Sequence, residues 1–425
     1  MISQFLFRLR ELSRLLWIRA AMISGLAVLV VVLAPVVTPF IPFTILEKIE
    51  VDTVRSLLDI LANSMLAVTT FSLTIMVTTH LTASQQVTPR AHRLLREDTR
   101  TQTVLATFIG AFVFSLTSIV FLQLDFISDE ARPVLYVVTL LVVALVIIAI
   151  IRWTGHLATL GSVEETTRRV EAAAAEAIQR RNDAPFFGGA KWAETDPLPE
   201  TGSTVFSRHA GFIQHIDTKQ ISDTAGASNA IFFLTATPGD WVGVGDALGV
   251  LNAETLSQDT EEELRSTFTI GDTRSFDQDP EFAVTVLAEI AERALSPSTN
   301  DPRTATDIIA RLVTLFETLE PETSVEAPEA PALRVKARDP HALLSTAFDP
   351  IARDGAGFVE VAHHVQVALH RLSKHRDRGV AASARVLSAR ALSHAEASLR
   401  LSADLARVTE AAPVEKAAER NPKVT

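Results

Sequence analysis

The sequence predicts a membrane α-helical protein: four spanning helices followed by a cytoplasmic α+β region with a small β-barrel or barrel-sandwich-like module and a helical domain. Mean hydropathy is +0.24 and 48 % of residues are hydrophobic, which is too apolar for an ordinary soluble protein of 425 residues. Residues 1–153 carry 12 Lys and Arg against 10 Asp and Glu, whereas the remainder carries 27 against 40. A nearly neutral apolar part joined to an acidic part is typical of a membrane domain followed by a soluble one.

Four apolar stretches are long enough to cross a bilayer. The hydrocarbon core is about 30 Å thick, so a spanning helix needs roughly 20 largely apolar residues. The predicted spans, all within a membrane domain at 1–153, are 17–43, 56–81, 103–123 and 133–151. A signal peptide is a poor alternative for the first span, because that segment is too long and lacks a small-residue cleavage site.

The charges of the connecting loops predict the orientation. Three segments are rich in arginine, and all three fall on the same side of the predicted membrane: Arg8, Arg10, Arg14 and Arg19; Arg90, Arg93, Arg96 and Arg100; Arg152, Arg168 and Arg169. The two loops on the other side have no net positive charge. Because basic loops stay inside, both termini and the large C-terminal region are expected in the cytoplasm, with the lipid bilayer of a bacterial inner membrane as partner.

Composition also excludes several classes of site. The chain has no cysteine, which excludes disulfides, thiol catalysis and metal sites built on thiolates, and which fits the reducing cytosol. The acidic soluble part argues against nucleic acid as a partner, because phosphate binding needs a cationic face.

The second span carries an unusual row of polar residues. At 100° per residue, one helix face holds Asn63, Thr70, Thr74 and Thr78. Such a stripe can line a hydrated path. It can equally bond to carbonyls of its own helix or to a neighbouring helix. Asn63 and the nearby Asp59 carry more weight than the threonines, because strongly polar groups in a membrane are usually functional.

Several motifs resemble a known family. In and around the second and third spans they are Ser64-Met65, Phe71–Thr74, Ala83–Arg90 and Phe112–Leu116, and in the soluble part they are Asp279–Phe282, Ala291–Pro297, Asn300–Pro302 and Thr304-Ala305. This set resembles an uncharacterised bacterial membrane-protein family, domain-of-unknown-function family 2254, over the chain to about residue 370. The resemblance implies a predicted inner-membrane protein without established activity, so it carries over no catalytic residue. Thr88 and Ser298-Thr299 depart from the expected pattern.

A short polar motif lies where the second span leaves the bilayer, at Gln85, Gln86, Pro89 and Arg90. Pro89 disfavours helix at the residue before it, so we expect a turn there. The following arginines can meet lipid phosphates, at about 1 kcal/mol each. The motif is therefore either a basic membrane-surface loop or a gate that couples the second span to the soluble part.

The soluble part divides into several predicted regions. Residues 154–199 read as a helical stalk and linker, 257–411 as a helical domain and 412–425 as a disordered tail. At 200–256, Pro238–Val242 followed by Gly245–Leu248 resembles the turn element of biotinyl and lipoyl carrier domains. Those domains present a modified lysine soon afterwards, but 252–259 contains none, so no cofactor attachment is expected. We therefore predict a small β-barrel that serves in assembly or binding.

The most distinctive soluble motif predicts a joint between two helices. Asp279-Pro280 is a cap with proline at the first helical position, Ser296-Pro297 ends that helix, and Asn300-Asp301-Pro302 begins the next. The alternative is a polar cluster that binds an anion at a helix N-terminus, formed by Arg274, Arg293, Asn300 and Asp301.

No pattern nominates catalytic residues, so we expect no enzyme, no cofactor and no metal site. Nucleotide-binding loops, the serine-hydrolase elbow and the metalloprotease motif are absent from the sequence. None of His363, His364, His370 and His375 lies four residues from another, as a zinc-binding helix requires. The favoured hypothesis is a homo-oligomeric channel or transport-related protein that passes a small anion or ion. The alternative is a membrane-anchored ligand-binding or sensory module with no transport role.

Overall fold

The computed structural model describes residues 16–37, 51–86, 88–91, 99–124, 126–127, 131–157, 161–193, 198–199, 201–323 and 326–413. The chain separates into two compact units, one ending at Thr166 and the other running from Thr167. Among the predicted features, Arg8, Arg10, Arg14, Arg93 and Arg96, and the tail from residue 414, lie outside these ranges. Each unit is considered by itself.

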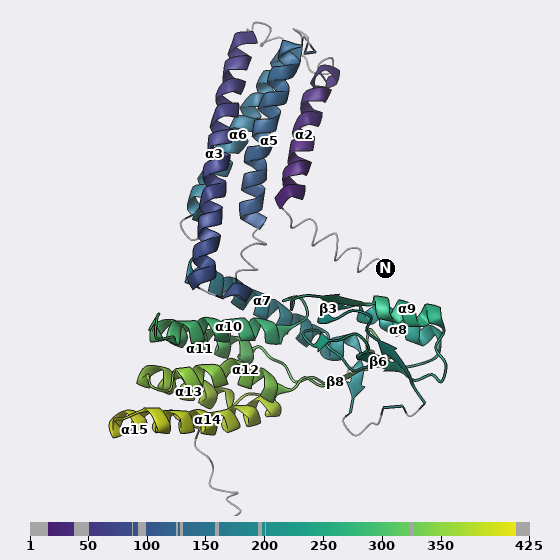
Figure 1. Ribbon diagram of the computed structural model, residues 1–425, viewed down its shortest axis with the longest axis vertical. Coiled ribbons are helices and arrows are strands. Elements are labelled where there is room, and N and C mark those ends of the chain that lie inside the picture. The colour runs from purple at the N-terminus through teal and green to yellow at the C-terminus, as the bar shows by residue number, and fades with distance from the viewer. Residues whose placement is uncertain are drawn as a thin grey trace, which may run out of the picture. The chain divides into compact units, whose positions relative to one another are not determined.

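The first unit is a bundle of four long apolar helices. They are α2 (Leu16–Val37), α3 (Val51–Gln86), α5 (Thr99–Gln123) and α6 (Arg132–Leu157), shown in Figure 1. All four are long and apolar enough to cross a membrane, which confirms the predicted number of spans. With 36 residues, α3 is longer than predicted. At about 1.5 Å per residue it exceeds the roughly 30 Å hydrocarbon core, and its last residues, after Thr79, continue the helix beyond the apolar stretch.

The bundle packs around α5, which contacts the other three helices. One buried cluster contains Val31, Leu58, Phe114 and Leu135, and a second contains Leu61, Met65, Phe108 and Trp153. At Gly110 the backbone of α5 lies so close to α2 that a Cβ would be 2.5 Å from the Ile23 side chain. Small residues allow such close approach between spanning helices.

The second unit begins with α7 (Val163–Asp183) and the short helix η3 (Pro185–Gly188), and its strands form two sheets. The first sheet has the order β1 (Ala190–Trp192), β8 (Leu333–Lys336), β4 (Phe232–Leu234), β6 (Ala247–Leu251) and β2 (Ser203–Phe206). The second has the order β5 (Trp241–Val242), β3 (Gly211–Ile216) and β7 (Phe268–Gly271). Strand β8 runs parallel to β1 and β4, and the other pairs are antiparallel.

The structure does not support the prediction of a small closed β-barrel at 200–256. Gly239 and Gly245 do adopt the positive φ angles that tight turns need. However, the strands on either side of Gly245 separate, because β5 joins one sheet and β6 the other. No closed barrel forms among the described strands. Three strands come from outside 200–256, namely β1, β7 and β8, and such long-range pairing leaves no local signal in the sequence.

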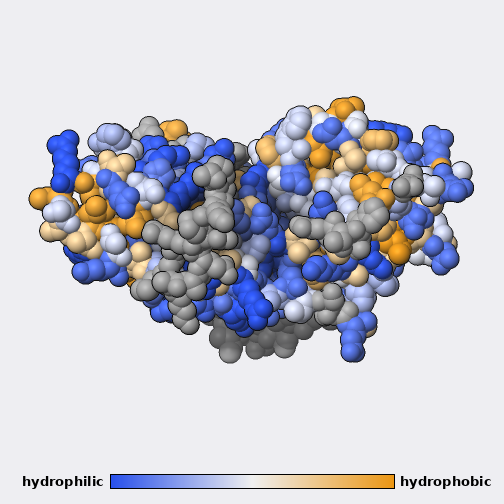
Figure 2. Space-filling model, turned by 90° about the horizontal axis from the view of Figure 1, so that it is seen from below, coloured by the Kyte–Doolittle hydropathy of each residue, from blue (hydrophilic) through white to orange (hydrophobic). Residues whose placement is uncertain are grey.

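Helices complete the second unit. Helices α8 (Thr218–Ala227) and α9 (Gln258–Ser266) pack beside the sheets. The predicted helical region contains α10 (Pro280–Leu295), α11 (Pro302–Glu317), α12 (Pro340–Asp354), α13 (Val359–Leu372), α14 (Arg378–Ser398) and α15 (Ser402–Ala411). Helix α10 packs on α11 and α12, and α13 packs on α11, α14 and α15, as Figure 1 shows. On the face that Figure 2 shows, hydrophilic side chains are interspersed with separate groups of hydrophobic ones.

Replacement of Gly249 by alanine tests the close packing of the first sheet. A Cβ at this position of β6 would lie 2.3 Å from ring carbons of the fully buried Phe232 and 2.7 Å from the Phe233 carbonyl oxygen. Overpacking of this kind costs about 1–3 kcal/mol. We expect Gly249→Ala to lower the thermal unfolding midpoint of the purified chain, followed by tryptophan fluorescence. Gly357→Ala is the control, since nothing lies within 4 Å of that Cβ; equal midpoints for the two variants would contradict the prediction.

Candidate functional site

One side of α3 is polar and exposed although the helix is long enough to span the membrane. We call this row the α3 stripe; it consists of Asp52, Ser56, Asp59, Asn63, Thr70, Thr74 and Thr78, all of them exposed. At 100° per residue they lie within about 60° of one line along the helix. The opposite side packs into the bundle through buried Val54, Leu58, Leu61 and Met65. Among the described helices of the first unit, the stripe therefore faces away from α2, α5 and α6.

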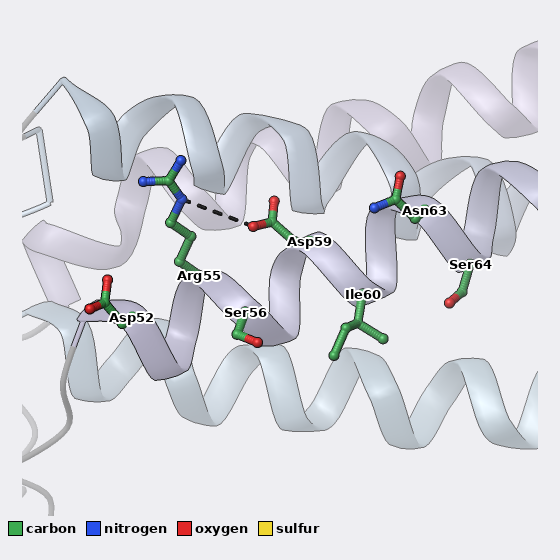
Figure 3. A pocket seen from close by; sticks show the side chains of 7 residues that line it. All are labelled: Asp52, Arg55, Ser56, Asp59, Ile60, Asn63 and Ser64. Atoms are coloured by element: carbon green, nitrogen blue, oxygen red, sulfur yellow. Dashed lines mark ion pairs between the residues drawn. The ribbon is translucent and has the colours of Figure 1, made fainter.

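An open hollow of about 500 Å³ lies along the first half of the stripe. The described residues that line it all belong to α3: Asp52, Arg55, Ser56, Asp59, Ile60, Asn63 and Ser64. Figure 3 shows Arg55, Asp59 and Asn63 pointing to one side, and Ser56, Ile60 and Ser64 to the other. Arg55 Nε lies 4.0 Å from Asp59 Oδ2, and both side chains are about half exposed, at 51 % and 52 %.

Asn63 is the stripe residue whose side chain most needs a hydrogen-bond partner. It lies close to the middle of the apolar stretch Val51–Thr79. Its amide makes no hydrogen bond within the described part of the chain, although an amide has two donor hydrogens and an acceptor oxygen. A polar group that is exposed to hydrocarbon without a partner costs several kcal/mol. The amide therefore needs water or another protein group beside it.

The threonine hydroxyls need no partner outside their own helix for their donor hydrogens. The Thr70 hydroxyl donates to the Leu66 carbonyl oxygen at 2.7 Å, and the Thr74 hydroxyl donates to the Thr70 carbonyl oxygen at 2.9 Å. These bonds within the helix are the ones expected if the threonines only pack in a membrane. Each hydroxyl oxygen nevertheless keeps acceptor capacity toward the exposed side. The threonines are therefore compatible both with a hydrated path and with simple packing in the membrane. The choice between these two interpretations depends on Asn63 and Asp59.

The predicted surface motif follows the end of the same helix. Gln85 and Gln86 are the last residues of α3, and only their backbone is described. Thr88 is buried, and its hydroxyl oxygen accepts from the Ala91 amide at 3.2 Å, so it caps a helical turn that begins at Pro89. Pro89 and Arg90 are exposed. The chain thus turns at Thr88, where the proline rule places the turn.

The predicted soluble polar cluster is divided between the two ends of α10. Arg274 donates to both carboxylate oxygens of Asp279, at 2.7 and 2.8 Å, and Asp279 caps α10 by accepting from the Phe282 amide at 2.9 Å. Burial raises the pKa of Asp279, and the hydrogen bonds from Arg274 oppose that rise. Asn300 and Asp301 follow the other end of this 16-residue helix, about 24 Å away along its axis.

The second end is the predicted joint between two helices. The Ser296 carbonyl accepts from the Asn300 amide at 2.9 Å, and Asn300 has a φ of 50°. Asp301 accepts from the Thr304 amide at 3.1 Å and from its hydroxyl at 2.6 Å. Arg293 lies in the last turn of α10. These bonds form a turn and a cap, so Arg274 does not lie in one site with Asn300 and Asp301.

Two of the four histidines considered in the sequence lie close to backbone carbonyl oxygens. Within the ranges given above, no group of three or more His, Cys, Asp or Glu could hold a metal ion. His364 Nδ1 lies 2.6 Å from the Glu360 carbonyl oxygen of its own helix, and His363 Nδ1 lies 3.4 Å from the Arg407 carbonyl oxygen.

Sequence reasoning missed one group of buried charges. Arg181, Glu322 and Arg338 meet between the end of α7, the segment after α11 and the exit of β8. Arg181 and Glu322 are separated by 141 positions in the sequence, and Arg338 lies farther along still, so no local pattern brings them together.

Comparison with known proteins identifies the family. The family described as "Predicted membrane protein (DUF2254)" matches residues 13–371. The chain belongs to this family. Uncharacterised proteins of Mycobacterium bovis and Mycobacterium tuberculosis are similar members of the curated set, 27 % identical over 240 residues. That match covers 54 % of the chain and 45 % of each relative, so the chain spans less than half of their length. No solved structure matches the chain.

The family description agrees with the four long apolar helices in placing this chain in a membrane. It attaches no activity, ligand or partner to the family. A function for this DUF2254 member therefore has to be argued from the geometry of its own residues.

The cap at Asp301 leads to a prediction about acid stability. Hydrogen bonds from Thr304 lower the pKa of Asp301 in the folded chain. A carboxylate with a lowered pKa contributes stability above its unfolded pKa, about 3.9, and this contribution is lost as the pH falls through the folded value. We expect the difference in unfolding midpoint between the wild type and Asp301→Asn to shrink as the pH falls below about 4.

Asp301→Ala is the companion variant. Because alanine removes the cap altogether, it should destabilise the second unit by about 1 kcal/mol at neutral pH, whereas asparagine keeps a cap. Thermal unfolding of the purified chain at several pH values measures both effects. A pH-independent difference between the wild type and Asp301→Asn would show that the Asp301 charge makes no contribution.

Proposed function

We propose that this chain is a subunit of a homo-oligomeric channel or transport-related protein of the bacterial inner membrane, with the α3 stripes of several copies facing one hydrated path. The observation that carries the proposal is Asn63, which is exposed near mid-span without a hydrogen-bond partner in the described residues. Both termini and the second unit would lie in the cytoplasm, where the second unit would assemble or gate the oligomer.

The energetics of polar groups in a membrane favour an assembly in which further copies of the chain cover the α3 stripe. In a single copy surrounded by lipid, the stripe would present the Asn63 amide and the Arg55–Asp59 pair to hydrocarbon and headgroups. Polar and ionisable groups at membrane depth nearly always face a bundle interior or a water-filled cavity. The four helices of one chain supply neither, because the stripe lies on their outer side. A symmetric assembly would supply both with one repeated surface.

The distribution of side chains around the stripe fits such an assembly. Exposed apolar residues flank it on both sides, with Leu66 and Leu73 on one and Ile60 and Phe71 on the other. The apolar flanks would pack against neighbouring copies, and the polar row between them would remain in contact with water. From Asp52 to Thr78 the row extends about 39 Å along the helix, which exceeds the thickness of the hydrocarbon core. A row of polar residues of this length, interrupted only between Asn63 and Thr70, suits a path that crosses the membrane.

The alternative function is a membrane-anchored ligand-binding or sensory module, in which the first unit only anchors the second. This alternative needs no water beside α3. The two functions therefore differ in the solvent that surrounds Thr70 and Thr74.

Cysteine scanning of α3 decides between them, because the natural chain contains no cysteine. Thr70→Cys and Thr74→Cys should react with a charged, water-soluble methanethiosulfonate in liposomes, since a thiol reacts as its water-stabilised thiolate. They should also cross-link to dimers under mild oxidation. Leu141→Cys on α6 is the matched control, because Leu141 is 64 % exposed on a helix without a polar row and should face lipid. Equal reactivity at all three positions would rule out a path along α3.

Ion flux into liposomes that contain the purified chain provides the functional measurement. Asn63→Leu should reduce flux more than Thr74→Leu, because the amide has unused donors and acceptors whereas the threonine hydroxyl already donates within its helix. Leu141→Ala should leave flux unchanged. Flux that is undetectable in the wild type, or equal in the wild type and Asn63→Leu, would reject the channel.

A further inference from the structure

Three charged residues from distant parts of the second unit meet in one group, in which the side chains of Arg181 and Glu322 are buried and Arg338 is half-buried. The side chains of Arg181 and Glu322 are 8 % and 7 % exposed. Arg181 Nε donates to one carboxylate oxygen of Glu322, and the other oxygen accepts from the backbone amide of Arg338 at 2.7 Å. The Arg338 guanidinium donates from Nη2 to the Glu320 carbonyl oxygen at 3.0 Å. Glu322 therefore neutralises one of the two arginines.

The donors of the two guanidinium groups exceed the acceptors around them. Three buried nitrogens have no hydrogen-bond partner in the part of the chain that the structure describes: Arg181 Nη1, Arg338 Nε and Arg338 Nη1. A buried donor without an acceptor is unfavourable, and more so when it carries charge. Burial and the neighbouring Arg181 lower the pKa of Arg338, and Glu322 and Asp377 oppose that effect. The two guanidinium groups therefore have more buried donors than acceptors around them, and the Glu322 carboxylate bonds to only one of them.

The Arg181 guanidinium packs against a turn whose backbone is strained. Its guanidinium stacks on the Phe187 ring, with 3.9 Å between the guanidinium carbon and the ring centroid. Phe186 and Phe187 both adopt positive φ angles, 54° and 55°, which side chains with a Cβ rarely adopt. Such strained backbone is found preferentially at active sites, ligand sites and switch regions. Phe186 itself is fully buried, so its packing helps to hold the strained turn.

The segment that carries Glu322 is also fixed from two other sides. The Asn182 amide donates to the Thr318 carbonyl oxygen at 2.7 Å and accepts from the Glu320 amide at 3.1 Å. Arg376 Nη2 lies 3.1 Å from a Glu320 carboxylate oxygen. Neither contact reaches the three unpartnered nitrogens. The two buried guanidinium groups are thus positioned by their surroundings while part of each remains unused.

We propose that Arg181 and Arg338 form a binding site for a small oxyanion of the phosphate class. A guanidinium is planar and presents paired donors that match the oxygens of such an anion. The bound anion would accept from the three unpartnered nitrogens and would supply the negative charge that Glu322 alone does not. This inference is independent of the proposed channel, since all its residues belong to the second unit.

Equilibrium dialysis of the full-length chain in detergent against radiolabelled inorganic phosphate, at constant ionic strength, tests the site. The wild type should bind phosphate saturably, one per chain, and Arg338→Gln should weaken binding at least tenfold, or about 1.4 kcal/mol. Arg371→Gln is the matched control, because Arg371 is a 65 % exposed arginine that pairs with Glu317 elsewhere on the helical layer. Its affinity for phosphate should equal that of the wild type.

Glu322→Gln separates binding from mere structural damage. Removing the only carboxylate bonded to Arg181 in the described structure raises the net charge of the group, so this variant should bind phosphate more tightly than the wild type. The same dialysis in nanodiscs of phosphatidylglycerol and of phosphatidylcholine distinguishes the source of the oxyanion. Equal binding in both indicates a free anion, and weaker binding only in phosphatidylglycerol indicates a lipid phosphate that competes for the same site.

Three results would overturn the proposal. The first is that the wild type binds no phosphate saturably at millimolar concentration. The second is that the wild type, Arg338→Gln and Glu322→Gln bind phosphate with equal affinity. The third is that Arg338→Gln and Arg371→Gln weaken phosphate binding equally. The first would mean that water satisfies the buried donors, as it often does for buried polar groups.

Discussion

A bilayer offers no hydrogen bonds to the groups that cross it, and this constraint organises the first unit of the molecule. It requires the backbone of every span to be helical, and it makes an unpartnered side-chain amide expensive. Helices α2, α5 and α6 meet the constraint with apolar surfaces. Helix α3 meets it only on the side that packs into the bundle, since Asn63 and the Arg55–Asp59 pair remain exposed. The proposed assembly of several copies follows from that one conflict.

The second unit shows the same relation between burial and polarity in another solvent. Arg274 and Asp279 are well matched, since every carboxylate oxygen has a donor and the pair caps α10. Arg181 and Arg338 are not matched, because Glu322 accepts from the Arg181 guanidinium and from the Arg338 backbone amide, while three guanidinium nitrogens have no partner in the described structure. Both groups of charges are largely buried, but only the group of Arg181 and Arg338 has donors that need a further hydrogen-bond acceptor. Local imbalance between donors and acceptors thus distinguishes a candidate ligand site from a structural ion pair.

Local sequence signals predicted the elements whose causes are themselves local. Hydropathy and length predict the four spans, and Asp279-Pro280 and Asp301-Pro302 predict the starts of α10 and α11, because a cap acts within three residues. The 3.6-residue period also placed Asn63, Thr70 and Thr74 on one helix face. What periodicity leaves open is whether that face meets α5, lipid or water. Only the packing of α3 shows that the stripe lies outside its own bundle.

The sequence by itself therefore determined the membrane class, the spans and the helix caps of this DUF2254 member, since each depends on residues that are close in the chain. Tertiary structure decided how the strands pair and where the charges meet. The glycine turns at Gly239 and Gly245 suggested a barrel, but β8, more than 80 residues later, enters the sheet beside β4 and opens the arrangement. Arg181 and Glu322 likewise meet across 141 positions. Pairings of that range depend on the packing of the whole unit, which no local pattern records.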